Sequence, residues 1–108
     1  MYLLSCNAQP CSQLPQTFKS YSQAISLVQK TAFNVKESAN TSGSSWISFV
    51  KYYSCDGATS YLIVKTDKGG EYIHRGVPME VCNEFKNAES KGSFYNSHIK
   101  HKFRLTLN

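Results

Sequence analysis

The chain has 108 residues, with 12 Lys and Arg against 7 Asp and Glu and a formal net charge of +5. This length predicts one domain of ordinary size with a single hydrophobic core. The positive balance favours acidic partners such as nucleic acid, a nucleotide or an acidic protein surface, although a charge of this size also serves solubility. No apolar run approaches the ~20 residues of a membrane helix, so no membrane partner is expected.

Residues 1–16 are rich in Gln, Pro and Ser and are expected to be a loosely ordered lead-in. The opening letters MYLLSC resemble the end of a lipoprotein signal. They lack the basic stretch and the apolar segment of about 7–15 residues that a signal peptide has. A cytoplasmic location with reduced thiols is therefore expected, and a truncated leader is left open.

The four cysteines are Cys6, Cys11, Cys55 and Cys82. Cys6 and Cys11 are separated by four residues, with no matching second pair and no histidine at the spacing of a zinc ligand. This pattern excludes a zinc site, and no metal or cofactor is expected. A pairing of Cys6 with Cys11 is left open.

Residues 17–43 are predicted to form an amphipathic helix followed by a linker. Apolar side chains recur at intervals of three and four residues at Phe18, Tyr21, Ile25, Val28, Ala32 and Val35. Thr17 can cap the start of this helix, or Ser20 and Gln23 can form a capping box slightly later. The run SANTSGSS at 38–45 ends the helix and serves as the linker.

Three short strands are predicted at Trp46–Tyr53, Ser60–Thr66 and Glu71–Arg75, because these segments are rich in aromatic and β-branched residues. The turn signals Asp56-Gly57 and DKGG join them into an antiparallel meander. In the first strand, Ile47 and Phe49 are expected on one face and Trp46 and Val50 on the other.

A sheet that is apolar on both faces needs cover on both faces. The C-terminal helix can cover one face and the helix in residues 17–35 the other, and a dimer interface is the alternative for the second cover. The fold class is therefore predicted as α+β, with a three-stranded antiparallel meander, a C-terminal helix and an extra N-terminal amphipathic helix.

Pro78 suits the first turn of the C-terminal helix. The apolar positions expected to face the sheet are Val77, Val81, Phe85 and Ala88. Gly92 is expected in the left-handed conformation that closes this helix. Asn96 can then cap a short helical turn, with Ile99 and Phe103 pointing inward.

The sequence contains no recognised catalytic motif. His74, His98 and His101 are the candidate bases, and Ser90 and the cysteines are the candidate nucleophiles. No paired carboxylates, phosphate-binding loop or nucleophile elbow accompanies them, and the glycines at 69–70 do not fit a phosphate loop. Isolated histidines are more often structural than catalytic. The chain is therefore not expected to be an enzyme.

A surface of aromatic and basic side chains is the stronger candidate. On the third predicted strand, Tyr72 and His74 share one face and Ile73 lies on the other. Ile73 is expected to face a core, which leaves Tyr72 and His74 on a half-exposed surface. Aromatic rings stack on bases while cations neutralise phosphates.

From Ser90 onward the chain has no carboxylate side chain but carries Lys91, His98, Lys100, His101, Lys102 and Arg104. The predicted ligand-binding residues are Tyr72, His74, Arg75, Lys91, Tyr95, Asn96, Lys100 and Lys102. Several of these residues also have an ordinary structural interpretation. Tyr72 can be a core aromatic under the N-terminal helix, Lys91 a surface lysine at a helix C-terminus, and Arg75 and Lys100 solvated side chains.

Three segments are specific in their order and spacing: SSWISFVKYY, YLIVKTDKGGEYIHRGVP and FKNAESKGSFYNSHIKHKF. Together they resemble the KTSC domain, a small module found alone in bacterial and phage proteins and at the C-terminus of some lysyl-tRNA synthetases. The resemblance covers residues 44–103. Its most specific parts are GVP at 76–78, AESKG at 88–92, and FYN followed by IK within 94–100.

The resemblance implies a strand meander with a helix, and it suggests RNA binding. The central Tyr-x-Tyr of the family is Tyr72-Ile73-His74 here, and a histidine can stack on a base as a tyrosine can. We therefore expect a module, in residues 44–108, that binds RNA, another single strand or a nucleotide. The alternative is a protein-interaction module, either a phage or mobile-element accessory protein that inhibits a host defence protein or a homodimer formed through the N-terminal helix.

Overall fold

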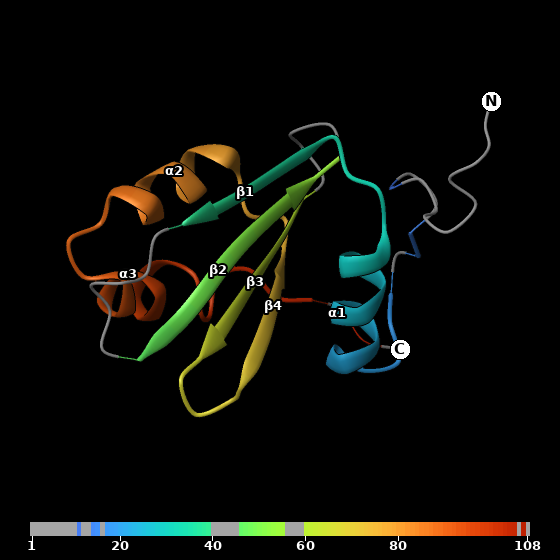
Figure 1. Cartoon of the computed structure of the whole chain (residues 1–108), viewed down its shortest axis with the longest axis horizontal. Coiled ribbons are helices and arrows are strands. Elements are labelled where there is room, and N and C mark those ends of the chain that lie inside the picture. The colour runs from blue at the N-terminus through green and yellow to red at the C-terminus, as the bar shows by residue number, and fades with distance from the viewer. Residues whose placement is uncertain are drawn as a thin grey trace.

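A four-stranded antiparallel sheet with the strand order β1-β2-β3-β4 forms the centre of the protein (Figure 1). The structure is a computed structural model that describes residues 11, 14–15, 17–39, 46–55, 60–105 and 107. Its elements in chain order are α1 (Tyr21–Lys30), β1 (Val35–Ala39), β2 (Ile47–Ser54), β3 (Ser60–Thr66), β4 (Glu71–Arg75), α2 (Met79–Asn87) and α3 (Lys91–His98). The predicted α+β class is confirmed, with one more strand than expected.

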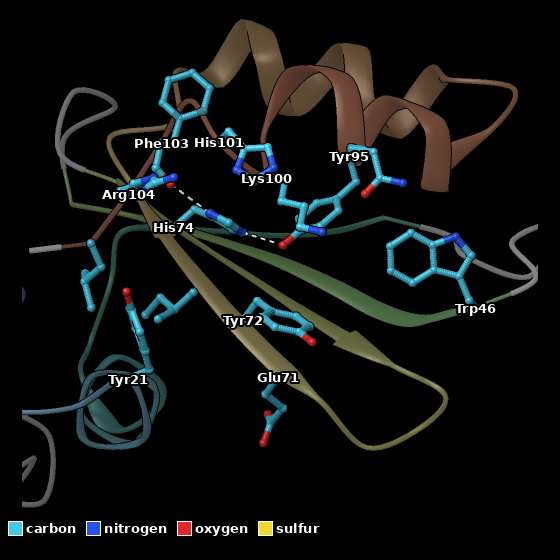
Figure 2. Close-up of a pocket in the computed structure, with 13 residues that line it drawn as sticks. Tyr21, Trp46, Glu71, Tyr72, His74, Tyr95, Lys100, His101, Phe103 and Arg104 are labelled. Atoms are coloured by element: carbon cyan, nitrogen blue, oxygen red, sulfur yellow. Dashed lines mark hydrogen bonds between the residues drawn. The ribbon is translucent and has the colours of Figure 1, made fainter.

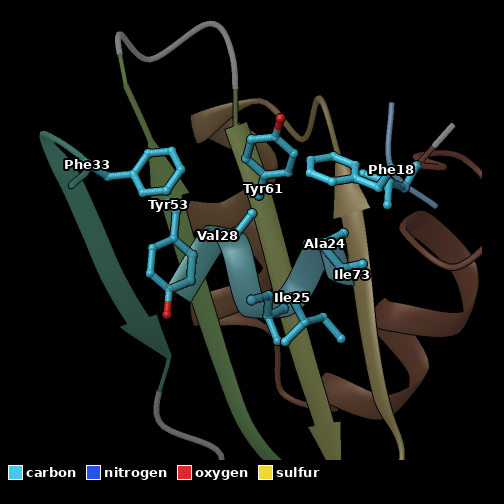
Figure 3. Close-up of a cluster of buried hydrophobic side chains, with 10 residues drawn as sticks. Phe18, Ala24, Ile25, Val28, Phe33, Tyr53, Tyr61 and Ile73 are labelled. Atoms are coloured by element: carbon cyan, nitrogen blue, oxygen red, sulfur yellow. The ribbon is translucent and has the colours of Figure 1, made fainter. Parts of the chain in front are cut away.

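Helices cover both faces of the sheet, as the two-sided apolar pattern predicts. The α1 core consists of Phe18, Ala24, Ile25, Val28, Phe33, Tyr53, Tyr61, Ile63, Ile73 and Leu105 (Figure 3). The α2/α3 core consists of Ile47, Val50, Tyr52, Leu62, Val64, Val77, Cys82, Phe85, Tyr95 and Ile99. Successive residues of β3 alternate between the two cores because side chains of a strand point to opposite faces. The chain's own helix therefore provides the second cover.

Helix α1 is shorter than predicted at both ends. Ser20 is its N-cap and accepts a hydrogen bond from the backbone N–H of Gln23 at 3.1 Å, which confirms the later of the two predicted starts. Phe18 precedes the helix and pairs with Leu107 in an isolated bridge. At the other end the helix stops at Lys30, because Thr31 is extended.

Val35 continues the helical spacing of the sequence but begins β1. This strand pairs antiparallel with β2, with Val35 opposite Ser54. Its residues are alternately half-buried and exposed, as in an edge strand. The predicted linker at 38–45 is therefore wrong for Ser38 and Ala39, and its remaining residues lie outside the described part of the chain.

Strands β2, β3 and β4 match their predictions within one residue, but β2 contains a bulge. Ile47 pairs with Thr66 and Phe49 with Lys65, so Ser48 is an extra residue. An extra residue reverses the alternation beyond it. Ile47 consequently lies in the α2/α3 core, whereas Phe49 packs against the α1 core, which contradicts the prediction that they share a face. The predicted Asp56-Gly57 turn lies outside the described residues.

The C-terminal part forms two helices. Ser90 caps α3 by accepting a hydrogen bond from the backbone N–H of Ser93 at 3.2 Å, so Asn96 lies inside the helix and does not cap it. Gly92 also lies inside α3, and among the described glycines the positive φ values belong to Gly69 and Gly76. The left-handed Gly92 was therefore a wrong prediction. Gly92 lacks a side chain for another reason, namely its close contact with Trp46, which is described below.

Cys11 and Cys55 form a disulfide with a Cα–Cα distance of 5.7 Å. This pairing contradicts the expectation of reduced thiols for these two cysteines. The buried Cys82 is free, while Cys6 lies outside the described residues. Within the described ranges no helix is long and apolar enough to cross a membrane, and no three metal-ligating side chains cluster.

Candidate functional site

A pocket of about 410 Å³ lies along β4, the strand at one edge of the sheet (Figure 2). Four elements form its walls: the start of α1, the residue before β2, strand β4, and α3 with the segment that follows it. The lining residues are Tyr21, Trp46, Glu71, Tyr72, Ile73, His74, Tyr95, Asn96, Lys100, His101, Phe103, Arg104 and Leu105.

Two exposed aromatic rings border this pocket. Tyr21 is 51% exposed and Tyr72 is 49% exposed, and they are two of the three large hydrophobic side chains that are exposed in the described chain. A Cβ at Gly70 would lie 3.1 Å from the Tyr72 hydroxyl and 3.4 Å from its Cε2. The ring therefore rests on the β3–β4 hairpin where a glycine leaves room for it, and the rest of its surface is open to the pocket.

His74 lies beside Tyr72 but is only 6% exposed. Its Nδ1 lies 2.8 Å from the carbonyl oxygen of Phe103, and its Nε2 lies 2.8 Å from the hydroxyl of Tyr95. A carbonyl oxygen only accepts, so Nδ1 donates its hydrogen to Phe103. In the neutral ring Nε2 then accepts a hydrogen bond from Tyr95. This chain of hydrogen bonds joins β4, α3 and the C-terminal segment.

The pKa values of both side chains favour this arrangement. Burial lowers the pKa of His74, and its hydrogen bond to Phe103 opposes that effect only in part. Burial, together with a smaller effect of the nearby Tyr72 hydroxyl, raises the pKa of Tyr95 to about 12. His74 is therefore held neutral and Tyr95 protonated. The prediction that His74 lies on a half-exposed surface is wrong, whereas it is correct for Tyr72.

Trp46 closes the end of the pocket beside α3. Its ring centroid lies 5.9 Å from that of Tyr95, edge to face. A Cβ at Gly92 would lie 2.2 Å from the indole Nε1, so a residue with any side chain would displace the indole. Gly92 thus lets α3 approach Trp46 closely, and this contact explains the glycine in the AESKG motif.

Charge is divided between two sides of the pocket. Two cationic side chains, Lys100 and Arg104, and the imidazole of His101 come from the segment after α3, which the hydrogen bond to His74 fixes in place. Glu71 lies at the start of β4. Figure 2 shows Tyr72 between this carboxylate and the cationic segment. Such a site can bind a planar ring that carries an anionic group.

The structure brings together five of the eight predicted ligand-binding residues: Tyr72, His74, Tyr95, Asn96 and Lys100 all line the pocket. Lys91 instead donates hydrogen bonds to the carbonyl oxygens of Lys86 (3.1 Å) and Ala88 (3.2 Å) at the end of α2. This geometry matches its alternative as a lysine at a helix C-terminus.

Arg75 and Lys102 do not line the pocket either. The Arg75 guanidinium lies 5.9 Å from the Tyr61 ring centroid, on the α1 face of the sheet. Lys102 is exposed. Sequence reasoning had omitted Tyr21, Trp46, Arg104 and other lining residues, because their proximity depends on contacts between distant segments. For Arg104 the basic composition of the tail was a usable signal.

The family model of the KTSC domain matches residues 44–103. This chain belongs to the KTSC domain family. The matched part of the KTSC domain contains β2, β3, β4, α2 and α3. It therefore includes every residue that lines the pocket except Tyr21, Arg104 and Leu105.

Similar proteins include a lysine–tRNA ligase of Trichormus variabilis, 39% identical over 57 residues, and one of Nostoc punctiforme, 37% identical over 58 residues. These matches cover 53% and 54% of this chain, respectively. In both cases the chain spans only 10% of the length of the relative. No solved structure matches the KTSC chain at a significant level.

Proposed function

We propose that this KTSC domain binds single-stranded RNA, another single strand or a nucleotide in the pocket along β4. In this proposal a base stacks on Tyr72, and a phosphate lies near Lys100 and Arg104. The observation that carries the proposal is the half-exposed ring of Tyr72 next to a cationic segment inside a concave site.

The expected energies suit a binding module. Stacking of a base on an aromatic side chain contributes about 1–3 kcal/mol. Each phosphate that a Lys or Arg neutralises adds a salt-dependent contribution through release of counterions. The pocket volume of about 410 Å³ falls within the usual range of about 300–1,000 Å³ for small-ligand sites. The lysine–tRNA ligases among the relatives are named for an RNA substrate, which favours RNA as the ligand.

The same geometry favours binding without catalysis. Both ring nitrogens of His74 are hydrogen-bonded within the chain, so His74 has no free nitrogen for proton transfer to a ligand. The alternative of a protein-interaction module or homodimer rested on an uncovered apolar stripe on the N-terminal helix. Ala24, Ile25 and Val28 of that stripe are buried against the chain's own sheet, so this argument no longer supports a partner.

Lys100 and Lys102 provide a matched test of the site. Both are exposed and lie two residues apart, but only Lys100 lines the pocket. We expect Lys100→Gln to weaken binding of fluorescein-labelled oligonucleotides at low salt and to reduce the slope of log affinity against log salt by about one. Lys102→Gln should change both quantities much less. Fluorescence anisotropy measures affinity and slope together.

Equal losses in the two lysine variants would indicate non-specific attraction to a basic tail. Absence of binding to any oligonucleotide at micromolar protein and low salt would contradict the proposal. The aromatic part has its own control, because Tyr72→Phe keeps a ring and Tyr72→Leu does not. Only the leucine variant should lose the stacking contribution.

A further inference from the structure

The distribution of charge around Tyr72 is asymmetric. Lys100, His101 and Arg104 all lie on the side formed by the C-terminal segment (Figure 2). On the other side lies Glu71, an exposed residue that also lines a smaller groove next to α1. Glu71 lies opposite Lys65 in the register of β3 and β4, but among the described residues the ion pair found is that of Lys86 with Glu37, and Glu71 is not a member of it.

This asymmetry matters because of the chemistry of a nucleic-acid strand. Every nucleoside inside a strand has a phosphate on both its 5′ and its 3′ side. If the base of such a nucleoside stacks on Tyr72, one phosphate can meet the cations, while the other is directed toward the side that holds Glu71. Two negative charges on that side repel each other, and the repulsion is strongest at low salt.

We propose that the pocket selects a nucleotide with a phosphate on one side only, namely a free nucleoside monophosphate or the terminal nucleotide of a strand that ends in a free hydroxyl. The inference rests on the proposed function, because it assumes a base on Tyr72. It assigns a specificity role to Glu71, which excludes the second phosphate. The role of Lys100 and Arg104 is to bind the first phosphate.

The pocket contains its own reporter, since Trp46 lines it and is the single tryptophan of the chain. Emission of Trp46 would be followed at low salt during titration with uridine 5′-monophosphate, uridine 3′-monophosphate, uridine and inorganic phosphate. Two oligouridylates complete the set, a linear one with a free hydroxyl at both ends and a covalently closed circle of the same length.

We expect the affinities of these ligands for the pocket to differ clearly. At least one uridine monophosphate and the linear strand with hydroxyl ends should bind about fivefold or more tightly than the circle, the size of effect that one screened surface charge can produce. Uridine and inorganic phosphate should each bind more weakly than the monophosphate. The two monophosphates distinguish a pocket that binds the phosphate on the 5′ side of the nucleoside from one that binds it on the 3′ side.

Glu71→Gln should reduce the ratio of the affinity for the linear strand to the affinity for the circular strand. The matched control is Glu80→Gln, which removes another exposed carboxylate, on α2, that does not line the pocket. This control should keep the wild-type ratio. Both side chains are exposed, so neither substitution disturbs a core.

Equal binding of circle and linear strand would overturn the inference while leaving the proposed function intact. An unchanged ratio in Glu71→Gln would overturn the role of Glu71. Inorganic phosphate that binds as tightly as a monophosphate would also overturn the inference, because no base would then be recognised. If no nucleotide, strand or nucleoside binds, the proposed function itself fails.

Discussion

The two faces of the sheet are covered to different extents at β4. On the α1 face, Ile73 is 3% exposed because the α1 core encloses it. On the opposite face its neighbour Tyr72 is 49% exposed. Figure 1 shows α1 beside β4 and α2 beside β1, so the helices are displaced toward opposite edges. A binding pocket can therefore arise at a sheet edge where α3 and the segment after it cover His74 of β4 but leave Tyr72 open.

The largest expected effect tests whether the α1 face is a true core. Phe18 is 1% exposed and contacts Tyr61 edge to face, with ring centroids 6.3 Å apart. Phe18→Ala should lower the free energy of unfolding by about 3–5 kcal/mol, as measured by urea denaturation. Tyr21→Ala is the control, because its half-exposed ring lies near the same helix end and should cost about 0.5 kcal/mol or less. Similar losses in both variants would contradict a difference between the two faces.

The next effect concerns the disulfide, which joins residues separated by 44 positions. Closing a loop of this length stabilises the folded state by about 4 kcal/mol in the chain-entropy model, and measured values are typically about 2–4 kcal/mol. We expect Cys55→Ser to lower the free energy of unfolding by about 2–4 kcal/mol. A reducing agent should produce the same loss in the wild type and none in the variant. Loss in both would show that the agent acts elsewhere.

The strands β2, β3 and β4 were predictable because their apolar, β-branched and aromatic residues are dense and lie between turn signals. Strand β1 was not, because its sequence VKESA is mostly polar and Val35 continues the spacing of the preceding helix. Its strand conformation depends on pairing with β2. Phe18 likewise fits the helical spacing, but Ser20 caps the helix after it.

A smaller effect is expected at the contact between Gly92 and Trp46, on the side of the sheet that α2 and α3 cover. Gly92→Ala places a Cβ where the indole now lies, and overpacking of this kind typically costs about 1–3 kcal/mol. The emission of Trp46 should change along with the free energy of unfolding. Ser93→Ala, at the next and exposed position of α3, should change neither. An unchanged emission spectrum in Gly92→Ala would contradict the described contact.

The smallest expected effect is the pH dependence of the hydrogen bonds at His74. Because burial lowers the pKa of His74 in the folded state, the unfolded state binds a proton first as the pH falls below about 6.5. The contribution of His74 to the free energy of unfolding is thus present above the pKa of His74 in the unfolded state. It is lost as the pH falls toward the lower pKa of His74 in the folded state. His74→Gln should remove this acid-dependent loss in urea denaturation at several pH values, whereas His98→Gln, at an exposed site, should retain it.

The candidate site was predictable only in part. Tyr72 was correctly placed from strand alternation and Lys100 from the basic tail. The burial of His74 was not predictable, because Phe103 is 29 residues away in the sequence and Tyr95 is 21 residues away. No local pattern indicates which distant segment folds back onto a strand. Gly92 was misread for the same reason, since the residue that it accommodates is Trp46.

The Cys11–Cys55 bond has a topological consequence. It makes residues 11–55 a covalently closed ring that contains α1, β1 and β2. A single proteolytic cut anywhere within this ring leaves both pieces joined. The nicked protein would migrate as one chain on a non-reducing gel and separate into two fragments only after reduction.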